Sequence, residues 1–247
     1  MMDFSAAQWV LIWIVAAAAY VVFGIAGVGV AQLARPVLEP FMPLLRMGPL
    51  LAVLDFGAAA TNLLCDGRQR VDMTELKRLL PWMLLGYGMG VVVRFQAGAT
   101  VTLMVGILAV AYALHALLHQ QAHKSFPATF AMPFGLLGGA FSALFGGGGF
   151  VYAVYLAGRV EDKECLRATQ SMLIGLSALG PLLFFLLAGA YHDSRLLMQA
   201  AALLPAMWGG LWLGRHITLR LSREQFLRIL HGIVLASGLA LLARYFF

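Results

Sequence analysis

Eight apolar segments run along the 247-residue chain, and their lengths constrain the fold more than any other feature. In order, they cover residues 6–34, 47–65, 79–93, 100–118, 128–158, 168–190, 196–213 and 226–247. Most are close to the ~20 residues that an α-helix needs to cross a hydrocarbon core of ~30 Å. The runs are continuous, whereas the strands of a membrane β-barrel alternate apolar and polar residues. The pattern therefore predicts an all-α fold with eight membrane segments, in a single membrane domain over residues 1–247.

The composition supports a chain that is embedded in lipid. Hydrophobic residues make up 62% of it and charged residues 11%, whereas soluble domains carry about 25% charged residues. The formal charge of +6 is distributed between the apolar runs, where basic residues meet lipid headgroups, so nucleic-acid binding is not expected. Because Cys65 and Cys165 lack the spacing of a metal or redox motif, we expect no cofactor and no metal. We expect a multi-pass protein of the cell (plasma or inner) membrane.

The chain divides into two halves of four segments each, over about residues 6–119 and 128–247. In the first segment of each half, glycines interrupt the apolar run: Gly27 and Gly29 in the first half, and the run 146–149 in the second. Glycine-interrupted segments in equivalent positions of two halves are typical of the substrate site of a transporter. Close helix packing through small residues is the alternative, but four consecutive glycines exceed what packing needs.

The segment over residues 128–158 would be about 46 Å long as one helix, which exceeds the bilayer core. If this segment crosses the membrane, the Lys and Arg residues divide seven against ten between the two sides. If it folds back at the glycines, they divide twelve against five, and the positive-inside rule favours this arrangement. We therefore predict that the segment is re-entrant. The same fold in the first segment would give two inverted repeats of three crossings each.

One long stretch of the second half carries a family resemblance. The sequence from Phe145 to Arg159, followed by Asp162-Lys163 and Arg167-Ala168-Thr169, resembles the TauE/SafE sulfite-exporter family. In the first half, the looser matches are Gly27-Val28-Gly29, Arg35-Pro36, Asp55, Asn62 and Leu79-Leu80-Pro81. The resemblance covers nearly the whole chain. It implies export of a small sulfur-containing or organic anion, such as sulfite, sulfoacetate, thiosulfate or a sulfonate.

The glycine breaks supply the expected anion site. A helix that starts at the second break leaves unpaired amide groups with about half a positive charge, and such an end binds anions. The candidate substrate-binding residues at the two breaks are Gly27, Gly29, Gly147, Gly148, Gly149 and Phe150. Polar residues on neighbouring helices complete the candidate site: Asn62, Thr169 and Gln170. Tyr152 and Tyr155 either line the pore or pack against it.

Two charged residues have competing interpretations. Asp55 lies in the middle of an apolar run, where an acid costs ~2.5–3.5 kcal/mol on insertion scales. It either couples transport to protons or makes a structural hydrogen bond, and the structural role is favoured. Arg167 could reach the substrate, but an anchor at the membrane boundary is the preferred interpretation.

The combined expectation is a secondary transporter that exports a small anion by alternating access around the glycine breaks. The alternatives are a non-transporting membrane assembly or sensor protein and an anion channel. An enzyme is not expected, because Ser142 has no His or Asp at a recognisable companion spacing. Homo-oligomer formation is left open.

Overall fold

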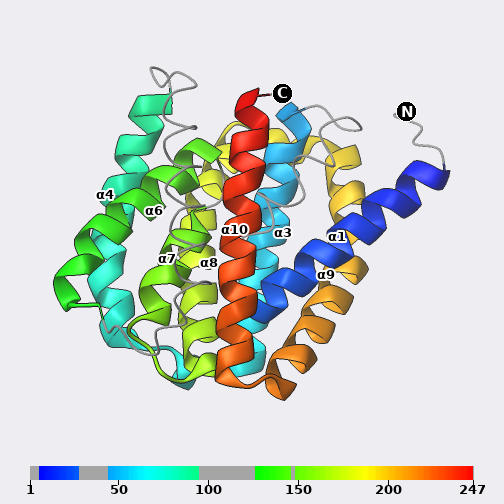
Figure 1. Cartoon of the computed structure of the whole chain (residues 1–247). Helices are drawn as coiled ribbons and strands as arrows, with labels where there is room; N and C mark the ends of the chain where they lie inside the picture. Colours follow the sequence, from blue (N-terminus) through cyan, green and yellow to red (C-terminus); the bar gives the residue numbers. More distant parts are fainter. Residues whose placement is uncertain (1–5, 28–43, 95–125, 146–147, 247) are drawn as a thin grey trace.

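The computed structural model describes residues 6–27, 44–94, 126–145 and 148–246, and within these ranges the chain is helical and forms no strand (Figure 1). The helices are α1 (Ala6–Ala26), α3 (Leu44–Asp66), α4 (Met73–Arg94), α6 (Ala131–Phe145), α7 (Gly149–Ala157), α8 (Lys163–Leu187), α9 (Ser194–Arg220) and α10 (Arg223–Phe246). Short 3-10 turns cover Arg68–Arg70, Ala128–Phe130 and Ala190–His192. The all-α prediction is confirmed for this part of the chain. The segment predicted over residues 100–118 and the end of the first segment lie outside the described residues.

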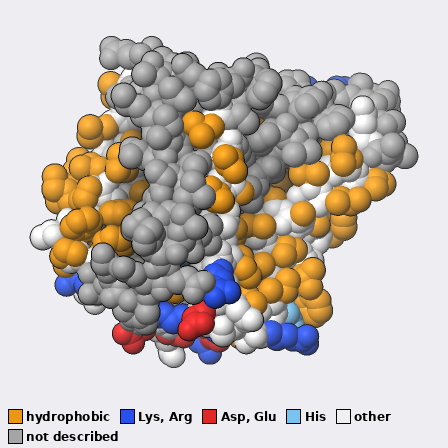
Figure 2. All heavy atoms as spheres, viewed as in Figure 1, with side chains coloured by type: hydrophobic (Ala, Val, Ile, Leu, Met, Phe, Trp, Pro, Cys, Tyr) orange, Lys and Arg blue, Asp and Glu red, His pale blue; other side chains and the backbone are white. Residues whose placement is uncertain are grey.

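Four of the described helices are long and apolar enough to cross a bilayer: α1, α3, α8 and α9. A shorter apolar helical stretch covers Ala128–Leu144. Large apolar side chains are exposed on the flanks of the bundle, including Leu84 and Met89 on α4 and Trp212 on α9. Apolar side chains cover much of the visible flank, while most of the visible charged ones gather at its lower end (Figure 2). This distribution is that of a helical bundle surrounded by lipid.

Two pairs of helices run parallel and in close contact through glycines. Along α1 and α9, a Cβ on Gly210 would lie 2.5 Å from Ala17 O, and one on Gly214 would lie 2.3 Å from Val21 O. Along α4 and α6, a Cβ on Gly86 would lie 2.1 Å from Leu136 O. A side chain at these glycines would therefore separate the helices. Close packing through small residues accounts for the glycines of these two pairs.

The third pair, α3 and α8, runs antiparallel. Asn62 Nδ2 donates to Ser171 Oγ at 3.2 Å, and a Cβ on Gly175 would lie 3.1 Å from Ala59 Cβ. Residue numbers thus fall along α3 as they rise along α8. This pair forms the centre of the bundle, between α1–α9 on one side and α4–α6 on the other (Figure 1).

The start of α8 differs from the prediction. The apolar run predicted a segment over residues 168–190, but the helix begins at Lys163. The reason is a side-chain cap, since the carboxylate of Asp162 accepts a hydrogen bond from Cys165 N at 2.8 Å. The extension places Arg167 inside the helix, not in the preceding loop.

Candidate functional site

The chain folds back on itself at the second glycine cluster. Helix α6 ends at Phe145 and α7 begins at Gly149. The two ends of the segment meet again, because Phe126 N donates to Gly158 O at 3.3 Å and Arg159 Nη1 donates to Phe126 O at 3.1 Å. A single crossing helix would place these residues at opposite ends. The predicted fold-back of this segment is therefore confirmed.

Gly148 is required at this break because its Cα packs so closely against α6 that no side chain fits between them. A Cβ added there would lie 1.8 Å from Gly138 O and 2.6 Å from Ser142 Oγ. Ser142 holds the turn, since its hydroxyl donates to Gly138 O at 2.9 Å and accepts from Gly148 N at 3.1 Å. Ser142 thus has a structural contact at the break that sequence reasoning did not assign. Gly147, also predicted for the site, lies outside the described residues.

The first break begins at Gly27. Helix α1 ends at Ala26, and Gly27 has a φ of 65°, in the left-handed region that favours glycine. Gly27 N still donates to Phe23 O at 2.7 Å, which closes the last turn of the helix. Helix α1 therefore ends just before the first of the predicted glycines, and the continuation of the segment after it stays a prediction. Gly29 and the chain up to residue 43 lie outside the described residues.

Gln170, on the second turn of α8, contacts both breaks. Its Nε2 donates to Gly149 O at the start of α7, and its side chain is fully buried. On the other side, a Cβ on Gly27 would lie 3.0 Å from Gln170 Cγ and 3.2 Å from Arg167 O. The structure thus brings four of the predicted residues together, namely Gly27, Gly148, Gly149 and Gln170.

Arg167 lies one helical turn before Gln170 and is only 1% exposed. Its Nη1 lies 3.4 Å from Gly24 O, near the end of α1. The interpretation of Arg167 as an anchor at the membrane boundary is therefore wrong, because its guanidinium lies inside the protein. A buried cation at the helix breaks adds positive charge where an anion would bind.

The other predicted polar residues face different neighbours. The amide of Asn62 contacts Ser171, which joins α3 to α8, and Thr169 Oγ1 accepts from Asp72 N at 2.9 Å, which joins the start of α4 to α8. Phe150 is buried and stacks on Phe141, with ring centroids 5.9 Å apart. These contacts position the helices around the breaks.

Asp55 lies farther along the bundle. Tyr20 OH donates to Asp55 Oδ1 at 3.5 Å, and both residues are buried between α1 and α3. Asp55 precedes Asn62 by seven residues, which is ~10 Å along the axis of α3. The contact fits the structural role, and proton coupling remains a hypothesis.

Tyr152 has a buried hydroxyl near the second break. Its ring lies against Gly138, where a Cβ would be 2.2 Å from Tyr152 Cε1. The side chain is fully buried, and its hydroxyl, close to Ser142, makes no hydrogen bond of ordinary geometry within the described residues. Tyrosine hydroxyls normally find a partner when they are buried. Tyr152 is thus a candidate donor for a ligand at the break.

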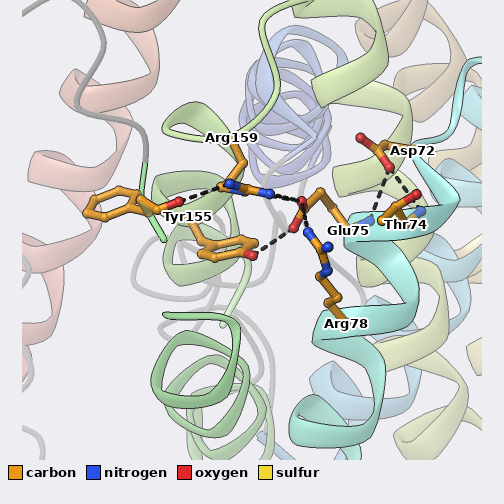
Figure 3. Close-up of polar contacts among 7 residues, drawn as sticks. Asp72, Thr74, Glu75, Arg78, Tyr155 and Arg159 are labelled. Carbon is orange, nitrogen blue, oxygen red and sulfur yellow. Dashed lines mark hydrogen bonds and ion pairs between the residues drawn. The ribbon is translucent and has the colours of Figure 1, made fainter. Parts of the chain in front are cut away.

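A second polar cluster closes the charged end of the bundle around Glu75 (Figure 3). Its carboxylate is 5% exposed and accepts hydrogen bonds from Arg159 Nη2, Arg78 Nη1 and Tyr155 OH, each at 2.7 Å. The backbone N–H of Glu75 donates to Asp72 Oδ1 at 3.1 Å, which caps α4. The cluster ties α4 to α7 and to the loop after it.

The neighbouring positive charges and hydrogen bonds keep the carboxyl group of Glu75 deprotonated. Glu75 lies in the polar first turn of α4, outside the apolar run that begins at Leu79. Burial alone would raise the pKa of Glu75, but the hydrogen bonds from Arg159 and Tyr155 and the charges of Arg159 and Arg78 lower it below its ordinary value. Glu75 is therefore ionised at neutral pH. Sequence reasoning missed this cluster, because Glu75 and Arg159 lie 84 residues apart and nothing in the sequence pairs them.

The fold and the apolar helices define the class of the chain as a polytopic α-helical membrane protein. The family profile described as "Sulfite exporter TauE/SafE" matches residues 12–241, which is nearly the whole chain. The chain belongs to the TauE/SafE family, a family of membrane anion exporters. No curated protein and no solved structure matches the chain.

Proposed function

We propose that this protein is a secondary transporter that exports a small anion, such as sulfite, thiosulfate or a sulfonate, by alternating access around the two helix breaks. The observation that carries the proposal is the position of Gln170, which contacts Gly149 at one break and Gly27 at the other. Family membership supports transport of an anion. The proposed site includes Gly27, Gly148, Gly149 and Gln170, together with Arg167 and Tyr152, whose burial beside the breaks favours the substrate roles that the sequence left open for them.

Two sources of positive potential favour an anion at this site. The first is the N-terminus of α7, whose first amide groups lack partners within the helix. The second is the buried guanidinium of Arg167, on the same face of α8 as Gln170 and three residues before it. Gln170 is seven residues into α8, ~10 Å from the first residue of that helix. The site would therefore lie inside the apolar part of the bundle, where the low dielectric strengthens both attractions.

The packing of the helices supports an inverted repeat. If the two halves are equivalent, α1 corresponds to α6, α3 to α8 and α4 to α9. Exchanging the two halves converts the α1–α9 pair into the α6–α4 pair. Both pairs are in close contact in the structure, and the helices run parallel in both. The α3–α8 pair would map onto itself, and it is antiparallel, as a two-fold axis in the membrane plane requires. Both halves would then contribute a break to one site.

The charged end of the bundle would face the cytoplasm. Arg70, Arg78, Arg159 and Lys163 gather there, with the α9–α10 connection, as the positive-inside rule expects. The membrane potential then favours export, since each negative charge that leaves the cell gains ~2.3 kcal/mol per 100 mV. Export of a monoanion therefore needs no second ion.

The proposal predicts that Gly27→Ala reduces saturable sulfite efflux from proteoliposomes at least tenfold. The added methyl would strain a residue with a φ of 65° and press on Gln170 Cγ, 3.0 Å away. Gly67→Ala is the matched control, because Gly67 has a φ of 80° but no atom within 4 Å of the added carbon. Both changes carry a similar backbone strain, so the two variants differ in the contacts of the added carbon with Gln170 and with Arg167 O, 3.2 Å away on the same helix. Equal efflux from the two variants would contradict a site at Gln170, and efflux that does not saturate would indicate a channel.

A further inference from the structure

One acceptor atom at the breaks has no hydrogen-bond partner among the residues that the structure describes. Gln170 Oε1 is fully buried and accepts no hydrogen bond from the described part of the chain. The orientation of the amide follows from its other atom: Nε2 faces Gly149 O, and a carbonyl oxygen only accepts, so the amide cannot be reversed. The methylene groups of the side chain are confined by the backbone at Gly27. Gln170 therefore cannot turn to satisfy its oxygen without losing the contact with α7.

The side-chain oxygen of Gln170 can be satisfied only by a hydrogen-bond donor. A buried acceptor without a partner destabilises the protein, so a ligand that supplies a donor removes this penalty and a ligand without one does not. An anion without an N–H or O–H group can only accept hydrogen bonds. Its negative oxygens would be repelled by the partial negative charge of Gln170 Oε1. The site thus presents donors to one part of a ligand, at the α7 N-terminus and Tyr152, and an acceptor to another part.

We propose that the transported anion carries a hydrogen-bond donor of its own, which it gives to Gln170 Oε1 while its anionic oxygens face the N-terminus of α7. The inference rests on the proposed function and names its substrate class. Suitable ligands are hydroxyalkane- or aminoalkanesulfonates and singly protonated oxyanions such as hydrogen sulfite. A fully deprotonated oxyanion or an unsubstituted alkanesulfonate lacks the donor and binds more weakly.

The test compares two ligands that differ by one hydroxyl group, 2-hydroxyethanesulfonate and ethanesulfonate. Their dissociation constants are measured by calorimetry on the full-length protein in detergent, with sulfite binding recorded in the same preparation. We expect 2-hydroxyethanesulfonate to bind the wild-type protein at least about tenfold more tightly, since the lost hydrogen bond leaves a buried acceptor unpaired. In Gln170→Met, which keeps the length of the side chain, the ratio of the two constants falls to about one.

Gln199→Met is the matched control. Gln199 also has a buried side-chain oxygen without a partner in the described residues, but it lies on α9, fifteen residues (~22 Å) before the Gly214 that packs on α1. The preference for the hydroxyl ligand should be unchanged in this variant.

Each result decides the inference. Equal affinity of the two sulfonates for the wild-type protein overturns it and leaves anion transport intact, and this comparison needs no variant to fold. A preference that persists in Gln170→Met, or that disappears in Gln199→Met, overturns the role of Gln170. If neither sulfonate binds, the inference is overturned, and the sulfite measurement shows whether the proposed function fails with it.

Discussion

Gly148→Ala is expected to abolish anion binding and efflux. The added methyl carbon would lie 1.8 Å from Gly138 O and 2.6 Å from Ser142 Oγ, and the first of these is a backbone atom that cannot rotate away. The start of α7 must then leave α6, and it carries Gly149 with it, away from Gln170. We expect loss of at least 90% of sulfite efflux in proteoliposomes, together with a lower melting temperature, because a displacement of ~1 Å at a site can cost 10²-fold.

The control for this change is Gly209→Ala. Gly209 lies within α9, and a Cβ there meets no atom within 4 Å, so helix propensity favours alanine. This variant should transport like the wild-type protein. Normal efflux by Gly148→Ala would show that the turn on α6 is not required, and that the glycines serve packing alone.

The second large effect is expected from Glu75→Gln. The carboxylate accepts from two arginines and a tyrosine, and an amide would present an N–H to one of these donors. Removing one partner of a buried pair costs about 3–5 kcal/mol, and partial exposure of Arg159 reduces this to about 2–3 kcal/mol. We expect the melting temperature in detergent to fall by about 5 °C or more.

Glu164→Gln is the matched control at the same end of the bundle. Glu164 pairs with Arg70, whose side chain is half exposed, and exposed pairs contribute about 0–1 kcal/mol. The dependence of the melting temperature on pH tests the role of Glu75 further. Because the pKa of Glu75 is lowered in the folded protein, its contribution is complete above the unfolded pKa of about 4.3 and is lost as the pH falls through the folded value. Equal melting temperatures for the two variants at neutral pH would contradict the role of the Glu75 cluster.

The positions of the helices could be predicted because hydrophobic length is directly visible in a sequence. The apolar runs placed α3 and α10 within about three residues of their observed bounds, whereas α4 begins earlier and α9 ends later than the runs predicted. The fold-back of the fifth segment was also predictable, because its length and the distribution of Lys and Arg both disagreed with a single crossing. The start of α8 was missed because the cap at Asp162 does not depend on hydrophobicity.

The candidate site could be predicted only in part. Four consecutive glycines indicated the break, but adjacent residues of one helix point in different directions, so Gln170 faces the breaks while Thr169 faces the start of α4. The sequence alone does not distinguish these directions. Arg167 was misplaced because an arginine near the end of an apolar run resembles an interfacial anchor. The pairing of Glu75 with Arg159 joins residues 84 positions apart, and only the folded chain brings them together.

The most direct test of the helix-break site is a crystal structure with selenite in place of sulfite, located by the anomalous scattering of selenium. We predict a selenium peak within about 4 Å of Gly149 N, at hydrogen-bond range through its oxygens, and next to Gln170 and Tyr152. A peak elsewhere in the bundle, or an unbroken helix through residues 145–149, would contradict the proposed site.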